Sequence, residues 1–277
     1  MDVPEVYLVA PSKKNNNCNG EQIMSPILAE FIGTAILLLF GCGVVANVIL
    51  NKTKGNSSGW IVITWGWGMG VFIAVFTMGQ FSGAHINPAV TLGLATAGLF
   101  DWAMVVPYIL AQVAGGFVGG FLTWLTYKDH FEATEDETTK LGVFSTIPEI
   151  RNYGSNFMTE VIGTFILIFG ILYLASPGFI DVNGEFLSTI TINGEEVGFG
   201  LGALSALPVA LLVFGIGLAL GGPTGYAINP ARDLGPRIAH AVLPFSKKGS
   251  SDWAYSWVPI VAPSVGAVLA GLVYLLL

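Results

Sequence analysis

Long apolar runs alternate with short polar connections along most of the chain. An α-helix needs about 20 consecutive apolar residues to cross the hydrocarbon of a bilayer. Six runs meet this length, at about 25–50, 60–79, 102–126, 156–176, 198–221 and 254–277. Two further apolar pieces, at about 88–98 and 230–243, are too short to cross, and each begins at an Asn-Pro pair. The pattern predicts an all-α membrane protein with six transmembrane helices and two half-helices.

The composition supports the same class. Of the 277 residues, 53% are hydrophobic and 10% are charged, and the mean hydropathy is +0.70. A soluble domain carries about 25% charged residues, so this chain has too little polar surface to face water on all sides. The formal net charge of −7 argues against nucleic-acid binding. The polar segments are a tail at 1–24 and long loops at 127–153 and 178–197.

The chain contains an internal repeat. AEFIGTAILLLFG at 29–41 matches TEVIGTFILIFG at 159–170, so Glu30 corresponds to Glu160. SGAHINPAVTLG at 82–93 returns as TGYAINPARDLG at 224–235. The domain from 25 to 277 therefore holds repeat one at 25–126 and repeat two at 154–277, each with three spans and one half-helix. An odd number of spans inverts the second copy in the membrane, and inverted repeats place their shared site near the midplane.

The two Asn-Pro-Ala motifs suit helices that begin inside the membrane. A helix of about 10 residues rises roughly 15 Å, half the hydrocarbon thickness, so two inverted copies would meet there at their N-termini. Asn is a good N-cap, and Pro is favoured at the first helical position. One such motif is a common helix start. Two in matching places indicate a site where side-chain amides face a passing oxygen; the motif residues are Asn87, Pro88, Ala89, Asn229, Pro230 and Ala231.

Glu30 and Glu160 lie within predicted spans. A carboxylate at the centre of a span costs about 2.5–3.5 kcal/mol even on the mildest scale, so each requires a reason. Both repeats carry the residue at the same place, and both need an acceptor for the N–H groups of the loop that leads to the half-helix. We expect this structural role; a proton relay is the alternative.

Paired NPA motifs, paired E-x-x-G-T starts and six spans with two half-helices resemble the aquaporin and glycerol-facilitator family. The likeness runs from about 25 to 277. GPTGYAINPARDLGP at 222–236 resembles the glycerol-facilitator branch, because Asp233 follows Arg232, and FSTIP at 144–148 is similar to a loop of that branch. The resemblance implies an aquaporin-like right-handed bundle, a homotetramer with one pore per protomer, and a cytoplasmic N-terminus.

The resemblance also implies a selectivity filter built from Trp67, Gly217, Tyr226 and Arg232. Water-selective members are similar to one another in having His at the position of Gly217, so glycine here is expected to leave space for a wider solute. Glycerol channels usually have Phe where this chain has Tyr226. Trp67 and Tyr226 would face a carbon backbone, and Arg232 would donate to hydroxyl oxygens.

Further residues are expected to support the pore. Backbone carbonyls at 83–86 and 225–228 would accept from hydroxyl groups of the permeant. The loop residues expected to support the pore are Ala84, His85, Ile86, Ala227 and Ile228. His85 is either a pore-side donor or a satisfied polar residue under its loop, and both can hold. Asp233 either pairs beside Arg232 or serves as a first-turn carboxylate. Arg237 and His240 are expected at the outer mouth or an interface. The glycines of AGGFVGGF at 114–121 are expected to pack helices within the protomer.

These residues favour a passive channel for glycerol and other small uncharged solutes, which also passes water and excludes ions and protons. A pore for water, urea or small protonated acids is an alternative within the class. A secondary active transporter also uses inverted repeats and broken helices, but would need a coupling-ion site. We expect no enzyme, no cofactor and no metal site, because no nucleophile–base pair is visible and Cys18 and Cys42 form no ligand cluster.

The expected location is the inner membrane of a bacterium, with the bilayer, the permeants and the sister protomers as partners. With the N-terminus in the cytoplasm, Lys13 and Lys14 lie inside, and the other Lys and Arg residues of the polar loops lie outside. The long loop at 178–197, which would also lie inside, contains no Lys or Arg. This distribution departs from the positive-inside rule.

Overall fold

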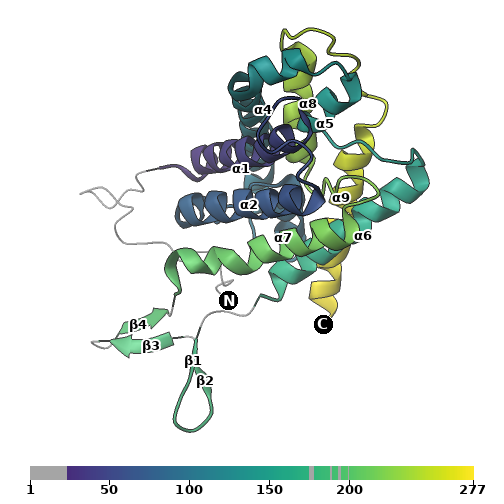
Figure 1. Ribbon diagram of the computed structural model, residues 1–277. Coiled ribbons are helices and arrows are strands. Elements are labelled where there is room, and N and C mark those ends of the chain that lie inside the picture. Colours follow the sequence, from purple (N-terminus) through teal and green to yellow (C-terminus); the bar gives the residue numbers. More distant parts are fainter. Residues whose placement is uncertain (1–23, 175–177, 188, 193–194, 199) are drawn as a thin grey trace.

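The computed structural model describes residues 24–174, 178–187, 189–192, 195–198 and 200–277, and six of its helices are long and apolar enough to cross a membrane (Figure 1). The predicted tail at 1–24 lies almost entirely outside these residues. The confirmed spans are α1 (Pro26–Ile49), α2 (Trp60–Ser82), α4 (Trp102–Ala133), α6 (Tyr153–Leu172), α7 (Leu207–Leu220) with the preceding 3-10 turn Gly202–Ala206, and α9 (Trp257–Leu276).

The two half-helices form where the sequence predicts them. They are α3 (Pro88–Thr96) and α8 (Pro230–Val242), and each begins directly after its Asn with proline in the first turn. Their lengths of 9 and 13 residues are too short for a full crossing. The fold class of six spans and two half-helices is therefore confirmed.

The helices pack as two related halves. In repeat one, α1 contacts α2 and α4; in repeat two, α6 contacts α7 and α9. Each half-helix then contacts the last helix of the other repeat, α3 on α9 and α8 on α4. This exchange joins the halves, so neither copy can complete its packing alone.

Two glycine pairs on α4 explain how three helices approach one another so closely. An added Cβ at Gly115 would lie 2.3 Å from the carbonyl oxygen of Phe31 on α1. One at Gly116 would lie 2.7 Å from the carbonyl oxygen of Ala231 on α8. The neighbouring Gly119 and Gly120 repeat the two contacts one turn later. The prediction that this stretch packs helices within the protomer is confirmed.

The segment 127–153 was expected to be a loop, and the structure corrects this. α4 continues to Ala133 beyond a non-helical residue at Tyr127, and α5 (Glu137–Phe144) follows. Asp136 caps α5 by accepting from the amide of Thr139 at 2.6 Å. The helix buries Lys140, whose ammonium donates to the carbonyl of Ser246 at 2.6 Å. A local cap and a tertiary contact thus make a helix from a polar sequence.

The segment 178–197 was also expected to be a loop, but its described residues include two short antiparallel hairpins. These are β1 (Phe179–Ile180) with β2 (Phe186–Leu187), and β3 (Thr189–Ile192) with β4 (Glu195–Gly198). Figure 1 shows them extending away from the helices near the start of α7. The fifth span accordingly begins at 202, later than the predicted 198.

Candidate functional site

The two half-helices meet at their N-termini through the motif asparagines. The side-chain nitrogen of Asn87 donates to the carbonyl of Ile228 at 2.9 Å, and that of Asn229 donates to the carbonyl of Ile86 at 2.9 Å. The side-chain oxygen of each Asn caps its own helix, accepting from the amide two residues on at 2.8 and 3.0 Å. These paired bonds hold both amides side by side at the centre of the fold.

Glu30 organises the loop before α3. Its carboxylate accepts from the amides of His85 at 2.9 Å and Ile86 at 2.6 Å. It also accepts from the side chains of Ser82 at 2.6 Å and Gln112 at 2.7 Å. With four donors on a fully buried carboxylate, the arrangement is that of a structural acceptor.

Glu160 does the same for the loop before α8. It accepts from the amides of Ala227 and Ile228, both at 2.9 Å, and from the hydroxyl of Thr224 at 2.7 Å. The two carboxylates therefore bind corresponding loop amides in the two repeats. Buried donors without such a partner would each cost about 1–3 kcal/mol.

The loops need this support because their backbone is strained. In these two loops, four residues that are not glycine have positive φ: Ala84 at 47°, Ile86 at 45°, Tyr226 at 38° and Ile228 at 42°. A side chain in this region costs roughly 1–2 kcal/mol. The same alternation occurs in both loops, so the strain belongs to the repeated design of the site.

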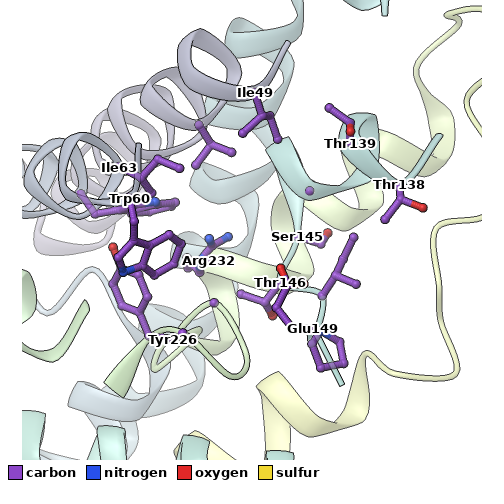
Figure 2. A pocket seen from close by; sticks show the side chains of 17 residues that line it. Ile49, Trp60, Ile63, Thr138, Thr139, Ser145, Thr146, Glu149, Tyr226 and Arg232 are labelled. Atoms are coloured by element: carbon purple, nitrogen blue, oxygen red, sulfur yellow. The ribbon is translucent and has the colours of Figure 1, made fainter. Parts of the chain in front are cut away.

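Three cavities follow one another through the fold. The mouth cavity has a volume of about 400 Å³, and the middle and far cavities have about 40 Å³ each. Figure 2 shows the mouth cavity, with Trp60, Tyr226 and Arg232 together on one side and Thr138, Thr139 and Glu149 on the other. The mouth and middle cavities share only three lining residues, which we call the constriction: Trp67, Tyr226 and Arg232.

The middle and far cavities share both motif asparagines and four aliphatic residues, Leu37, Val71, Leu167 and Val213. These aliphatic residues were not predicted as pore residues, although the repeat contains them. Leu37 and Leu167 each lie seven residues after the repeat glutamate, and Val71 and Val213 each lie sixteen residues before the motif asparagine. The centre of the passage is therefore amphipathic, with two amides on an apolar wall.

At the constriction, Arg232 lies over the indole of Trp67, with 4.2 Å from its Cζ to the ring centroid. One of its terminal nitrogens donates to the carbonyl of Phe144 at 3.4 Å. The guanidinium has five N–H donors. Stacking on Trp67 and one long hydrogen bond leave it able to bind oxygen atoms in the passage.

Gly217 differs from expectation. It lines none of the three cavities described. A Cβ at this position would lie 2.8 Å from the Tyr226 ring and 2.9 Å from the Thr64 methyl group. The space that glycine provides is thus occupied by the Tyr226 ring, which forms this wall of the constriction.

Comparison with known proteins agrees with this architecture. The sequence model of the Major intrinsic protein family matches residues 18–274. The chain belongs to the major intrinsic protein family.

Relatives in this family are similar over nearly their full length. A probable glycerol uptake facilitator of Thermotoga maritima is 51% identical, over 91% of this chain and 98% of its own. A glycerol uptake facilitator of Streptococcus pneumoniae is 50% identical, over 91% and 99%. The crystal structure of an aquaglyceroporin from Plasmodium falciparum has a TM-score of 0.72 at 32% identity, covering 90% of this chain and 93% of that one.

Within this family member, Asp233 is paired with Arg237 and not with Arg232. The ion pair is fully buried at 2.7 Å, and Asp233 also accepts from the amide and hydroxyl of Thr146 at 2.8 and 2.7 Å. Arg237 donates to the carbonyl of Ser251 at 2.7 Å. Arg237 and His240, expected at the outer mouth or an interface, are both fully buried. The spacing of four residues between Asp233 and Arg237 could have indicated the pair.

His85 lines the far cavity and is also satisfied beneath its loop. Its Nδ1 lies 3.1 Å from the hydroxyl of Thr91, and its ring packs at 4.5 Å from Phe100 and 5.1 Å from Tyr108, measured between centroids. Both expected roles are therefore compatible with its position. Glu30 does not line the far cavity, because its oxygens accept from backbone and side-chain donors beneath the loop.

The far cavity is lined by the repeat counterparts of the four predicted filter residues. Counting from the motif asparagines pairs Trp67 with Val209, Gly217 with Val75, Tyr226 with Ala84, and Arg232 with Val90. All four counterparts line the far cavity, and all are apolar. The constriction is thus built in only one of the two copies, so its arginine and aromatic side chains stand at one end of the passage only.

Proposed function

We propose that this protein is a passive channel for glycerol and other small uncharged solutes, which also passes water. The observation that carries this proposal is the line of three cavities joined by shared residues, with a cationic and aromatic constriction above two central amides. The glycerol uptake facilitators among its relatives support glycerol as the solute. Movement of a solute along these cavities requires no covalent bond to form or break, so we propose a channel and not an enzyme.

The geometry suits a short polyol. Leu37, Val71, Leu167 and Val213 offer apolar surface to the carbon backbone, while Arg232 and the two asparagines line the same cavity with N–H donors. Each hydroxyl that leaves water needs a replacement partner, since burying one without a hydrogen bond costs about 1–3 kcal/mol by protein measurements. A solute with one apolar face and several hydroxyls loses least on entering.

Arg232 and the two half-helix N-termini would oppose the passage of cations. Arg232 carries a fixed positive charge at the constriction, and the N-termini of α3 and α8 place two positive dipole ends at the motif asparagines. A proton moving along a file of water molecules would meet the same barrier. We therefore propose that ions and protons are excluded by electrostatics at two successive levels.

Stopped-flow light scattering on proteoliposomes tests the function. Glycerol, urea and water permeabilities should exceed those of protein-free liposomes, and imposed proton or sodium gradients should leave the final glycerol distribution unchanged. Accumulation of glycerol against its gradient would identify a coupled transporter and overturn the channel proposal.

A second candidate permeant is a small protonated acid. A D/L-lactic acid transporter of Lactiplantibacillus plantarum is 40% identical to this chain, over 88% of this chain and 94% of its own. A protonated hydroxy acid resembles glycerol in size and in carrying adjacent oxygens. Adding lactic acid at low external pH to the same assay decides whether the passage accepts both.

Replacing Gly217 with alanine is expected to lower glycerol permeability several-fold more than water permeability. The added methyl group would meet the Tyr226 ring at 2.8 Å, so the ring must move toward Trp67 and Arg232 and narrow the constriction. Gly215→Ala is the matched control on the same helix, because a Cβ there meets nothing within 4 Å. Equal losses for glycerol and water in Gly217→Ala would reject the constriction assignment.

We further propose a homotetramer in a bacterial inner membrane, with the N-terminus in the cytoplasm. Four spans separate the start of α1 from the hairpins between α6 and α7, so both lie on the same side of the membrane. On that side the described polar residues include Asp101, Asp181 and Glu185, while the described Lys and Arg residues belong to the other half of the molecule. The proposed orientation therefore stands on the family resemblance, against the charge distribution.

A further inference from the structure

Lys140 on α5 is fully buried, which lysine almost never is unless its charge has a partner. Its ammonium donates to the carbonyls of Ser246 at 2.6 Å and Lys247 at 3.2 Å, in the loop between α8 and α9. The described residues place no carboxylate within ion-pair distance of it. Backbone carbonyls of a distant loop therefore hold this charge, and the same bonds attach the middle of α5 to that loop.

The chain that follows Lys140 is attached a second time at Thr146, just beyond the end of α5. The carboxylate of Asp233 accepts from the amide and the hydroxyl of Thr146 at 2.8 and 2.7 Å. Phe144 lies between the two attachments and is fully buried, and its ring stacks on that of Phe245 with 6.1 Å between the centroids. This short stretch is thus held at both ends and in its middle.

The carbonyl of Phe144 is the group through which α5 contacts the constriction. It belongs to the last turn of the helix, where carbonyl groups have no intrahelical donor, and it accepts from a terminal nitrogen of Arg232 at 3.4 Å. Among the described residues, no other group accepts a hydrogen bond from the Arg232 guanidinium. The C-terminal end of a helix also favours a nearby cation. The direction of the guanidinium therefore depends on where α5 stands and on its stacking over Trp67.

We infer that Lys140 is a positioning residue for Arg232, acting from outside the passage through α5 and the carbonyl of Phe144. The inference rests on the proposed glycerol channel and adds a determinant of its selectivity. Lys140 lines none of the three cavities described, so it does not meet the permeant. Without its attachment α5 can shift, and the guanidinium then loses its acceptor and its fixed direction. Glycerol depends on those N–H donors more than water does, because water is smaller and can bind them in more orientations.

The test compares glycerol and water permeabilities in proteoliposomes of the wild type, Lys140→Met and Lys140→Arg. After subtraction of the lipid background, the ratio of the two permeabilities does not depend on how much protein is folded, so a merely structural role would not change it. The ratio should fall about threefold to tenfold in Lys140→Met, the effect of one hydrogen bond. It should recover in part in Lys140→Arg, which keeps a cationic donor. An unchanged ratio in Lys140→Met overturns the inference.

Lys247→Met is the matched control. It removes a lysine from the loop that Lys140 binds, but this ammonium pairs with Glu135 at 3.2 Å, and both side chains are largely exposed. The backbone carbonyl that accepts from Lys140 remains in this variant. Its permeability ratio should stay at the wild-type value. A fall equal to that of Lys140→Met would assign the effect to lost charge at the mouth and overturn the inference.

A double-mutant cycle shows whether Lys140 acts through Arg232. Residues that act through one another are not additive. In the Arg232→Val background, the further change Lys140→Met should leave the permeability ratio unchanged, because the group that Lys140 positions is gone. A further fall of the same size would mean that Lys140 shapes the passage by another route, and it would overturn the inference.

Gly249→Ala keeps the test decisive if Lys140→Met does not fold. A Cβ at Gly249 would lie 2.8 Å from the Cβ of Glu137 in the first turn of α5, so the loop and the helix must move apart. The permeability ratio should fall in the same direction, and a wild-type ratio would show that the stance of α5 does not direct Arg232. Wild-type liposomes that pass glycerol no faster than protein-free ones would instead reject the channel itself.

Discussion

Replacing Arg232 with valine is expected to open the channel to small cations. Arg232 is the charged residue of the constriction and lies against Trp67. A unit charge about 4 Å from a permeating cation raises its free energy by about 4 kcal/mol at an effective dielectric constant of about 20. Even half of that barrier corresponds to roughly a 30-fold change in rate. Ion flux into liposomes, followed with a potassium- or proton-sensitive dye, measures the effect.

Two controls separate charge from size in that experiment. Arg232→Lys keeps the charge and should keep cations out, although its single ammonium cannot reproduce the guanidinium geometry. Arg151→Val removes a cation that pairs with Asp252 at the surface, and should leave ion flux at background. If Arg232→Val conducts no more than the wild type, the helix N-termini at Asn87 and Asn229 carry the barrier and Arg232 does not.

Replacing Glu160 with leucine is expected to have the largest effect on stability. The change leaves the amides of Ala227 and Ile228 and the hydroxyl of Thr224 without their acceptor. Each orphaned buried donor costs about 1–3 kcal/mol, and a loss of about 3 kcal/mol lowers the melting temperature by roughly 6–12 °C for a chain of this size. Thermal unfolding of the purified protein in detergent measures it.

Glu135→Leu is the matched control for that substitution. Glu135 pairs with Lys247 at 3.2 Å, but both side chains are largely exposed, and such pairs contribute about 0–1 kcal/mol. Its melting temperature should therefore stay close to that of the wild type. Should Glu160→Leu melt like Glu135→Leu while losing activity, the carboxylate would have a role in permeation beyond supporting the loop.

Much of the architecture could be predicted from sequence because it is specified locally or by duplication. Apolar runs of sufficient length fix the spans, and Asn-Pro fixes the start of α3 and α8, because capping and proline geometry act within a few residues. The repeat adds a relation between distant segments: an odd number of spans forces inversion, and inversion brings Asn87 and Asn229 together. The same relation predicts that Glu30 and Glu160 act alike.

The expected loop at 127–153 was wrong for a physical reason. α5 has a polar sequence whose helix depends on a cap at Asp136 and on burial of its inner face. Lys140 would be expected at the surface, yet its ammonium reaches backbone carbonyls of a segment more than 100 residues away. Such long-range partners leave no periodic pattern in the local sequence.

The sequence by itself determined the class of the protein and its inverted repeat, and the family resemblance indicated Trp67, Tyr226 and Arg232 at the constriction. Only the tertiary structure decided how those residues use the space: that the Tyr226 ring fills the position opened by Gly217, that Asp233 pairs with Arg237, and that Arg232 stacks on Trp67. Spacing along the chain specifies backbone conformation within a few residues. The partner of a buried side chain depends on which helices meet and how closely, and that is settled only when all of them pack together.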